Sequence, residues 1–74
     1  MCLGLPMLVE RIDKNFMAVA EAMGVKRNIS ILLVPDVQPG ELVLVHAGFA
    51  MEVIAKKEAA ERMEILQSML GEPV

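Results

Sequence analysis

The sequence carries a single cysteine, Cys2, and this feature most constrains how a chain of 74 residues can be stabilised. A domain this small buries only roughly 60% of its unfolded surface, so small proteins often add disulfides or a structural metal. One cysteine cannot form an internal disulfide, and the chain lacks the partners for a closed zinc site. The fold must therefore depend on packing, which a hydrophobic content of 55% suits.

Composition argues against several classes of protein. The net charge is −3, and the chain has no Trp, no Tyr and two Phe. Nucleic-acid binders usually present a basic face with stacking aromatic residues, and this chain has neither. No apolar run approaches the roughly 18 residues of a membrane span, and the apolar start lacks the basic region of a secretory signal. We expect a soluble cytoplasmic protein of one domain, with its lone thiol reduced.

Period-two alternation and turn residues predict five short strands. They are expected at 7–13, 16–23, 29–34, 42–45 and 49–54. The run 16–23 could be helical by propensity, but eight residues between turns are short for a helix, so a strand is favoured. The polar segment 13–15 and Gly24 suit turns, and Gln38-Pro39-Gly40-Glu41 has the pattern of a type II turn. Gly48 interrupts the last two strands, as at a bulge or a sharp bend of a barrel.

The last segment changes period and predicts a helix over 56–70. Its apolar residues recur at helical spacing: Ala59, Met63, Leu66 and Leu70. Glu58 and Arg62 form a favourably oriented i,i+4 pair, and Gly71 suits the position after the helix end. Five antiparallel strands and a terminal helix predict a mostly β protein, with a small closed or nearly closed barrel over 7–54, because closure hides strand edges.

Residues 1–6 are expected to project from this barrel as an N-terminal arm. Pro6 fixes its own φ and biases Leu5 toward extended backbone, and Gly4 permits a close backbone approach. Leu3 and Leu5 would be exposed on a projecting arm, and exposed apolar residues mark partner surfaces.

Methionine is abundant, with seven residues in the chain. Most are expected in the core, but methionine also suits surfaces that accept partners, and Met7 and Met51 are assigned to that role. The basic pair Lys26-Arg27 is interpreted as solvated surface.

Cys2 is the first candidate for chemistry. Removal of Met1 would leave its thiol beside a free α-amine, whose positive charge favours the thiolate. Sulfur and amine together can chelate a soft or borderline metal. The alternative is an inert thiol in a loose terminal segment.

His46, the only histidine, is the second candidate. Alternation places it on the same face as Leu42 and Leu44, where an ordinary strand-end histidine is one interpretation. The other is a metal ligand or proton acceptor near Cys2. The two residues could also indicate a thiol hydrolase, but no third orienting group or family signature surrounds the thiol. A non-catalytic protein is therefore favoured.

Three segments resemble the HypC/HupF hydrogenase maturation chaperones over nearly the whole chain: MCLGLP, VKRNISILLVPDVQPGELVLVHAGFAMEVI, and the acidic-rich C-terminal helix. The pattern MC-x-[AG]-x-P at the extreme terminus and the motif VHAGFA carry most of this resemblance. One departure is that Met7 and Leu8 follow Pro6, where the family usually has Gly and a basic or polar residue.

The resemblance implies an OB-like barrel that helps to build the Fe(CN)2CO unit of [NiFe] hydrogenases. It implies pairing with the iron–sulfur protein HypD and delivery of the iron unit to the hydrogenase large-subunit precursor. Cys2 matches the family's essential cysteine and His46 its motif histidine, while Gly4 and Pro6 match the opening motif. Iron would be held transiently, without a tightly bound structural metal. The alternative is an OB-like module that binds peptide or nucleic acid and has no metal role.

Overall fold

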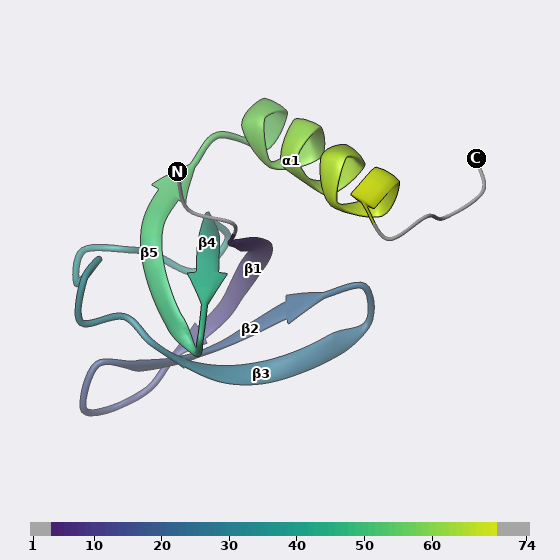
Figure 1. The fold of residues 1–74 in the computed structure, drawn as a ribbon. Helices are drawn as coiled ribbons and strands as arrows, with labels where there is room; N and C mark the ends of the chain where they lie inside the picture. The colour runs from purple at the N-terminus through teal and green to yellow at the C-terminus, as the bar shows by residue number, and fades with distance from the viewer. Residues whose placement is uncertain (1–3, 70–74) are drawn as a thin grey trace.

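The computed structural model describes residues 4–69, which form five strands and one helix. These elements are β1 (Leu5–Ile12), β2 (Met17–Ala22), β3 (Val25–Ser30), β4 (Leu42–His46), β5 (Phe49–Ile54) and α1 (Lys56–Met69). The strands close into a barrel in the order β1-β2-β3-β5-β4, and α1 lies on one side of it after β5 (Figure 1). The predicted mostly β fold, with a barrel and a C-terminal helix, is confirmed.

The barrel is antiparallel at every strand pair except the one that closes it. Neighbouring strands β1–β2, β2–β3, β4–β5 and β1–β4 pair antiparallel. The closing pair, β3–β5, is parallel and consists of Ser30 opposite Phe49. This contact is short because the β2–β3 hairpin extends away from the barrel beyond β5 (Figure 1).

The β2–β3 and β4–β5 hairpins have two-residue turns, whereas residues 13–16 connect β1 and β2. Each connection contains two consecutive residues of positive φ: Asn15-Phe16, Met23-Gly24 and Ala47-Gly48. Two consecutive left-handed residues make a type I′ turn, whose twist matches that of the strands it joins. Gly48 therefore lies in a tight hairpin turn rather than at a bulge within a strand.

The predicted strand at 29–34 is wrong in its position, because β3 ends at Ser30. The Ser30 hydroxyl accepts a hydrogen bond from the Leu32 amide, and the Val34 amide donates to the Ile31 carbonyl at 3.0 Å. These turns bury Ile31 and, three residues farther, partly bury Val34. The apolar run thus has a turn-like period of three after Ser30, although its composition is typical of a strand.

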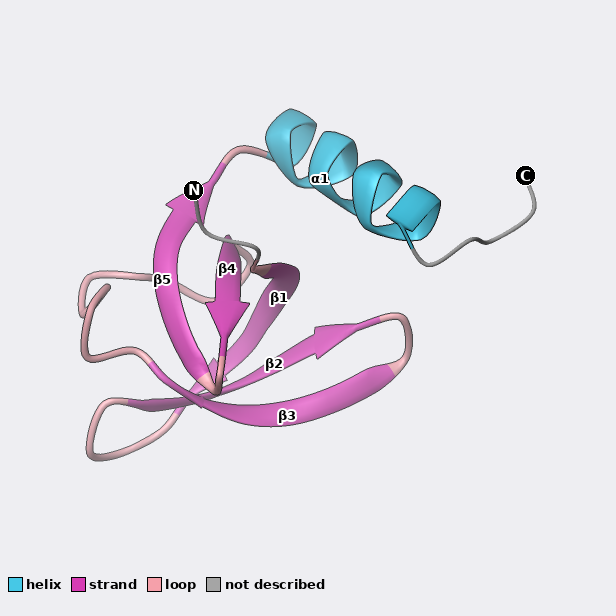
Figure 2. Cartoon of the chain, viewed as in Figure 1, coloured by secondary structure: helices cyan, strands magenta, loops and turns pink. Residues whose placement is uncertain are grey.

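The long connection from β3 to β4 continues through the predicted type II turn (Figure 2). The Glu41 amide donates to the Gln38 carbonyl at 3.1 Å, and Gly40 has a φ of 96°. A positive φ at the third position is the feature that requires glycine in this turn type. The predicted turn is therefore confirmed.

The barrel interior is filled mainly by small and β-branched side chains. On β2 every second residue points inward, so Ala18, Ala20 and Ala22 are buried. They pack in one cluster with the larger side chains Met7, Val9, Ile29, Ile31, Val37 and Val43, and with Ala50. Alanines on β2 leave room for these larger residues inside a narrow barrel.

A second, smaller cluster attaches the helix to the outside of the barrel. Ala59 of α1 packs with Leu44 and Ile54, and Leu42 is partly buried against them. The Glu58 carboxylate and the Arg62 guanidinium form the predicted ion pair at 3.0 Å. The predicted helix is confirmed through Met69, while Leu70 and Gly71 lie outside the described residues. Within residues 4–69, no helix has the length and apolar character to cross a membrane.

Candidate functional site

The start of β1 lies against the end of β4. Leu5 pairs with Val45 and Pro6 with Leu44 in an antiparallel ladder. Pro6 fits this place because β1 has only β4 as a neighbour there, the pairing with β2 starting at Leu8. Leu5 and Pro6 therefore belong to the barrel, so the predicted projecting arm over 1–6 is wrong for these two residues.

Gly4 is the residue that allows this close approach. It is buried, and a Cβ at this position would lie 3.1 Å from the Leu44 Cβ and 3.4 Å from the Val45 amide nitrogen. The contact with Leu44 is tighter than ordinary packing allows, so Leu44 would have to move by a few tenths of an ångström. The glycine predicted to permit a close backbone approach does so, against β4. Cys2 and Leu3, the other predicted residues of this segment, lie outside the described residues.

His46 lies at the same end of the barrel as the start of β1. It is the last residue of β4, directly after Val45, and its side chain is exposed. By alternation it continues the outer face of Leu42 and Leu44, beyond the part of that face that α1 covers. No hydrogen bond or ion pair of the imidazole is formed with another residue of the described chain. The ring is therefore accessible to a ligand.

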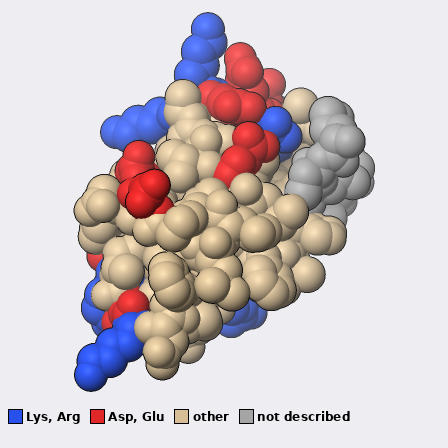
Figure 3. Space-filling model, turned by 90° about the vertical axis from the view of Figure 1, so that its left-hand side faces the viewer, with Lys and Arg blue, Asp and Glu red and all other residues tan. Residues whose placement is uncertain are grey.

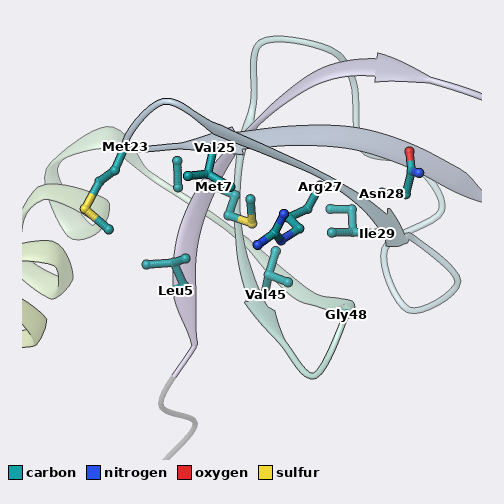
Figure 4. Close-up of a pocket in the computed structure, with 10 residues that line it drawn as sticks. Leu5, Met7, Met23, Val25, Arg27, Asn28, Ile29, Val45 and Gly48 are labelled. Carbon is teal, nitrogen blue, oxygen red and sulfur yellow. The ribbon is translucent and has the colours of Figure 1, made fainter.

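A pocket of about 380 Å³ opens beside these residues (Figure 4). Its walls come from four strands and the β2–β3 turn, and they are formed mainly by Leu5, Met7, Met23, Val25, Arg27 and Val45. Met7 is only 3% exposed because alternation places it inside the barrel. Met7 therefore does not lie on an exposed surface, and its side chain instead contributes to the wall of the pocket; its contact with a partner stays a prediction.

Arg27 is the charged residue of this pocket. The residue is exposed, in agreement with its predicted place on solvated surface, but its part in a pocket was not predicted. It pairs across the hairpin with Ala20, which is fully buried, so the arginine occupies an inward-facing position of β3. Figure 4 shows its guanidinium directed toward Met7 and Val45, whereas the Asn28 side chain points away. Within residues 4–69 no carboxylate forms an ion pair with it. The signal was available, because period two places Arg27 between Val25 and Ile29 on one face.

A different face of the protein is broad and uncharged. Figure 3 shows it as a continuous surface with charged groups gathered at its margins. Strand β5 and the loop after β3 lie on the side that this view faces (Figure 1). Strand β5 carries three exposed apolar side chains, Phe49, Met51 and Val53, and the loop after β3 carries Leu32 and Leu33. We call these five residues the apolar face. Met51 is 40% exposed, as its predicted partner-facing role requires.

The described residues hold no preformed metal site of their own. Within residues 4–69, no three side chains of His, Cys, Asp or Glu lie close enough together to hold a metal ion. A metal bound at the end of the barrel near His46 would therefore need ligands from Cys2 or from another molecule.

Comparison with known proteins places the chain among relatives of nearly its own length. The model of the HupF/HypC family matches residues 1–66. Hydrogenase maturation factor HypC of Helicobacter hepaticus is 42% identical over 77 residues, which cover 97% of this chain and 90% of the relative. Hydrogenase maturation factor HypC of Escherichia coli (strain K12) is 40% identical over 75 residues, which cover 93% of this chain and 82% of the relative.

A third relative is named for its operon. The Frd operon uncharacterized protein C of Proteus vulgaris is 41% identical over 75 residues, which cover 93% of this chain and 78% of the relative. The matched residues include the buried Gly4, the pocket residue Arg27 and the exposed His46, so the comparison extends over the whole site described above. This chain belongs to the HupF/HypC family.

Proposed function

We propose that this protein is a non-catalytic accessory factor of hydrogenase maturation, which carries iron as the Fe(CN)2CO unit through the thiolate of Cys2. Family membership supports a role in maturation, since relatives at about 40% identity are named hydrogenase maturation factors. The observation that supports the finer proposal is the pairing of Leu5 with Val45, which brings the start of β1 and His46 to one end of the barrel.

Chain length limits how far the thiol can lie from this end. Two peptide units separate Cys2 from Gly4, so their Cα atoms lie within about 7 Å of each other. Gly4 itself lies against Leu44 and Val45, immediately before His46 in β4. On this support, we propose that the Cys2 thiolate and the His46 imidazole share one iron unit.

The chemistry of these donors suits a carrier rather than a storage site. A thiolate is a strong donor to low-spin iron that also holds cyanide and carbon monoxide. One or two protein ligands leave the coordination sphere open, so a partner can share the iron and then take it. His46 would act as the second ligand or as a proton acceptor, and its exposure leaves both roles accessible.

Two partners follow from this proposal. A HypD-like iron–sulfur protein would hold the iron jointly with Cys2 while the diatomic ligands are added, and the large-subunit precursor would receive the unit. We place this work in the cytoplasm, where a reducing environment keeps the lone thiol available. The apolar face around Met51 offers these proteins a docking surface, because exposed apolar groups of this kind mark interaction sites.

A co-purification experiment tests the proposal. The tagged protein, with and without Cys2→Ala, is expressed with a HypD-type partner and a hydrogenase large-subunit precursor in a host that lacks its own HypC-type factors. We expect the wild-type protein to recover both partners and to restore hydrogenase activity, and Cys2→Ala to lose both. Lys57→Ala, an exposed helix substitution, serves as the matched control. Full maturation with Cys2→Ala would reject the thiol-carrier proposal.

A further inference from the structure

The β2–β3 hairpin leaves one edge of β3 open. β2 pairs with β3 along its full length, but the pairing of β3 with β5 is confined to Ser30 and Phe49. Beyond that pair, no strand formed by residues 4–69 lies against the outer edge of β3 from Val25 to Ile29. A free strand edge presents unpaired backbone donors and acceptors.

The direction of these backbone groups follows from one hydrogen bond. The Ser30 amide donates to the Gly48 carbonyl at 2.9 Å, so the backbone of Ser30 faces β5. Backbone groups of successive residues point alternately to the two sides of a strand. Those of Asn28 and Lys26 therefore face the same side as Ser30, where they are open to an incoming strand.

The pocket lies along this open edge. Val25, Arg27 and Ile29 share the face of β3 that lines it, and Val45 forms part of the opposite wall (Figure 4). A strand added to β3 would direct every second side chain toward this face. Backbone pairing would thus supply affinity and the pocket would supply specificity, as in other proteins that bind peptides by strand addition.

Arg27 determines the charge of the occupant. It is the one charged residue of the pocket lining, and no carboxylate of the described chain pairs with it. An inward-pointing charge can also protect a free edge from aggregation. Protection alone does not explain Met23, which is 65% exposed at the pocket rim and held at a φ of 51°. Both the exposure of this apolar side chain and its left-handed backbone are unfavourable. Methionine suits adaptable binding surfaces, so a binding role accounts for its presence here.

We propose that the free edge of β3 binds an extended segment of a partner protein that carries a large aliphatic residue and a carboxylate two positions apart. The backbone of the segment pairs with Lys26 and Asn28. Its aliphatic side chain enters the pocket between Met23 and Val45, and its carboxylate meets Arg27. The spacing of two is required because only alternate residues of an added strand face the pocket.

Peptide titration followed by nuclear magnetic resonance tests this spacing. The probe is acetyl-Thr-Leu-Thr-Glu-Thr-amide, and the matched control is acetyl-Thr-Thr-Leu-Glu-Thr-amide, which has the same composition with the two residues adjacent. We expect the probe to shift the amides of Lys26 and Asn28 and the methyl group of Met23, with affinity about fivefold above the control. Equal affinities, or no shift of these groups at the solubility limit, would overturn the proposal.

Two variants test the individual contacts. Arg27→Gln should lower the affinity for the probe about fivefold. Lys14→Gln, with the same charge change in the β1–β2 turn, should leave that affinity unchanged. Met23→Asn gives an Asn-Gly turn, which type I′ geometry prefers, so it should weaken binding while the melting temperature stays equal or rises. Undiminished probe binding by both pocket variants would contradict the assigned contacts.

Other occupants of the edge would also be detected. Sedimentation velocity together with amide exchange would reveal a dimer paired through β3, and an oligothymidylate would reveal nucleic-acid binding. Protection of Lys26 and Asn28 in a dimer, or stronger shifts with the oligonucleotide than with the probe, would each overturn the proposal. None of these probes needs Cys2 or a metal, so their failure leaves the thiol-carrier proposal untouched.

Discussion

Leu5 of β1 pairs with Val45 of β4, and this register sets the start of β1 beside His46. The same two residues contribute to the wall of the pocket that follows the open edge of β3. One end of a small barrel thus combines the start of β1, an exposed imidazole and a groove whose described lining holds one cation, Arg27. We expect iron transfer and partner recognition to be adjacent but separable.

Gly4→Ala should destabilise the protein, because its Cβ would press against the buried Leu44. Overpacking of this kind costs about 1–3 kcal/mol, and urea unfolding would measure it. The exposed Lys57→Ala change should stay within about 0.5 kcal/mol of wild type. A Gly4→Ala protein as stable as wild type would show that the start of β1 does not lie against β4 as described.

His46→Ala should leave stability nearly unchanged, since the side chain is exposed and forms no hydrogen bond within residues 4–69. We expect a change of less than about 0.5 kcal/mol in unfolding free energy, together with impaired iron loading of the partner complex. Thermal unfolding and metal analysis provide the two measurements. A large loss of stability, with normal iron loading, would make His46 an ordinary packing residue.

Phe16 is held at a φ of 56° and is 50% exposed, so its backbone is strained without the benefit of burial. Phe16→Gly should be more stable than Phe16→Ala by about 1 kcal/mol, because only glycine adopts left-handed backbone freely. Comparing these two variants removes the effect of the lost aromatic ring from the result. Equal stability in urea unfolding would mean that the turn does not have type I′ geometry.

Leu44→Ala should be among the most damaging substitutions. Leu44 is fully buried between the barrel and α1, where it packs with Ile54 and Ala59. Truncating such a leucine costs about 2–5 kcal/mol, a large share of the stability of a small domain. Circular dichroism during urea unfolding would record an early loss of helix. Met51→Ala, at an exposed position, should have little effect on the same curve.

The strands and the helix were predicted correctly where the local sequence pattern matches the pattern of buried side chains. The run 16–23 was predicted as a strand because it is short between two turns, and β2 confirms it with alternating burial. The helical spacing around Ala59 corresponds to a buried face, so the helix is also confirmed. The run after Ser30 was mispredicted because its apolar residues fill the barrel from successive turns. Composition alone does not distinguish these turns from a strand.

From the sequence, a residue of the candidate site was predictable only where its own side-chain chemistry marks it, without knowledge of its neighbours in the fold. His46 stands out as the only histidine, and its exposure agrees with a ligand role, which stays a prediction. Arg27 was missed because its importance depends on the short β3–β5 pairing, which leaves a pocket under an inward-facing position. The assignment of Leu5 and Pro6 to an arm failed for a similar reason, since register with β4 is a long-range property.

Infrared spectroscopy of the complex with a HypD-type partner tests the central claim most directly. The wild-type complex, purified without air, should show bands of iron-bound cyanide and carbon monoxide, and the complex formed with Cys2→Ala should lack them while Lys57→Ala retains them. Undiminished cyanide and carbonyl bands in the Cys2→Ala complex would contradict the claim that this thiol holds the iron unit.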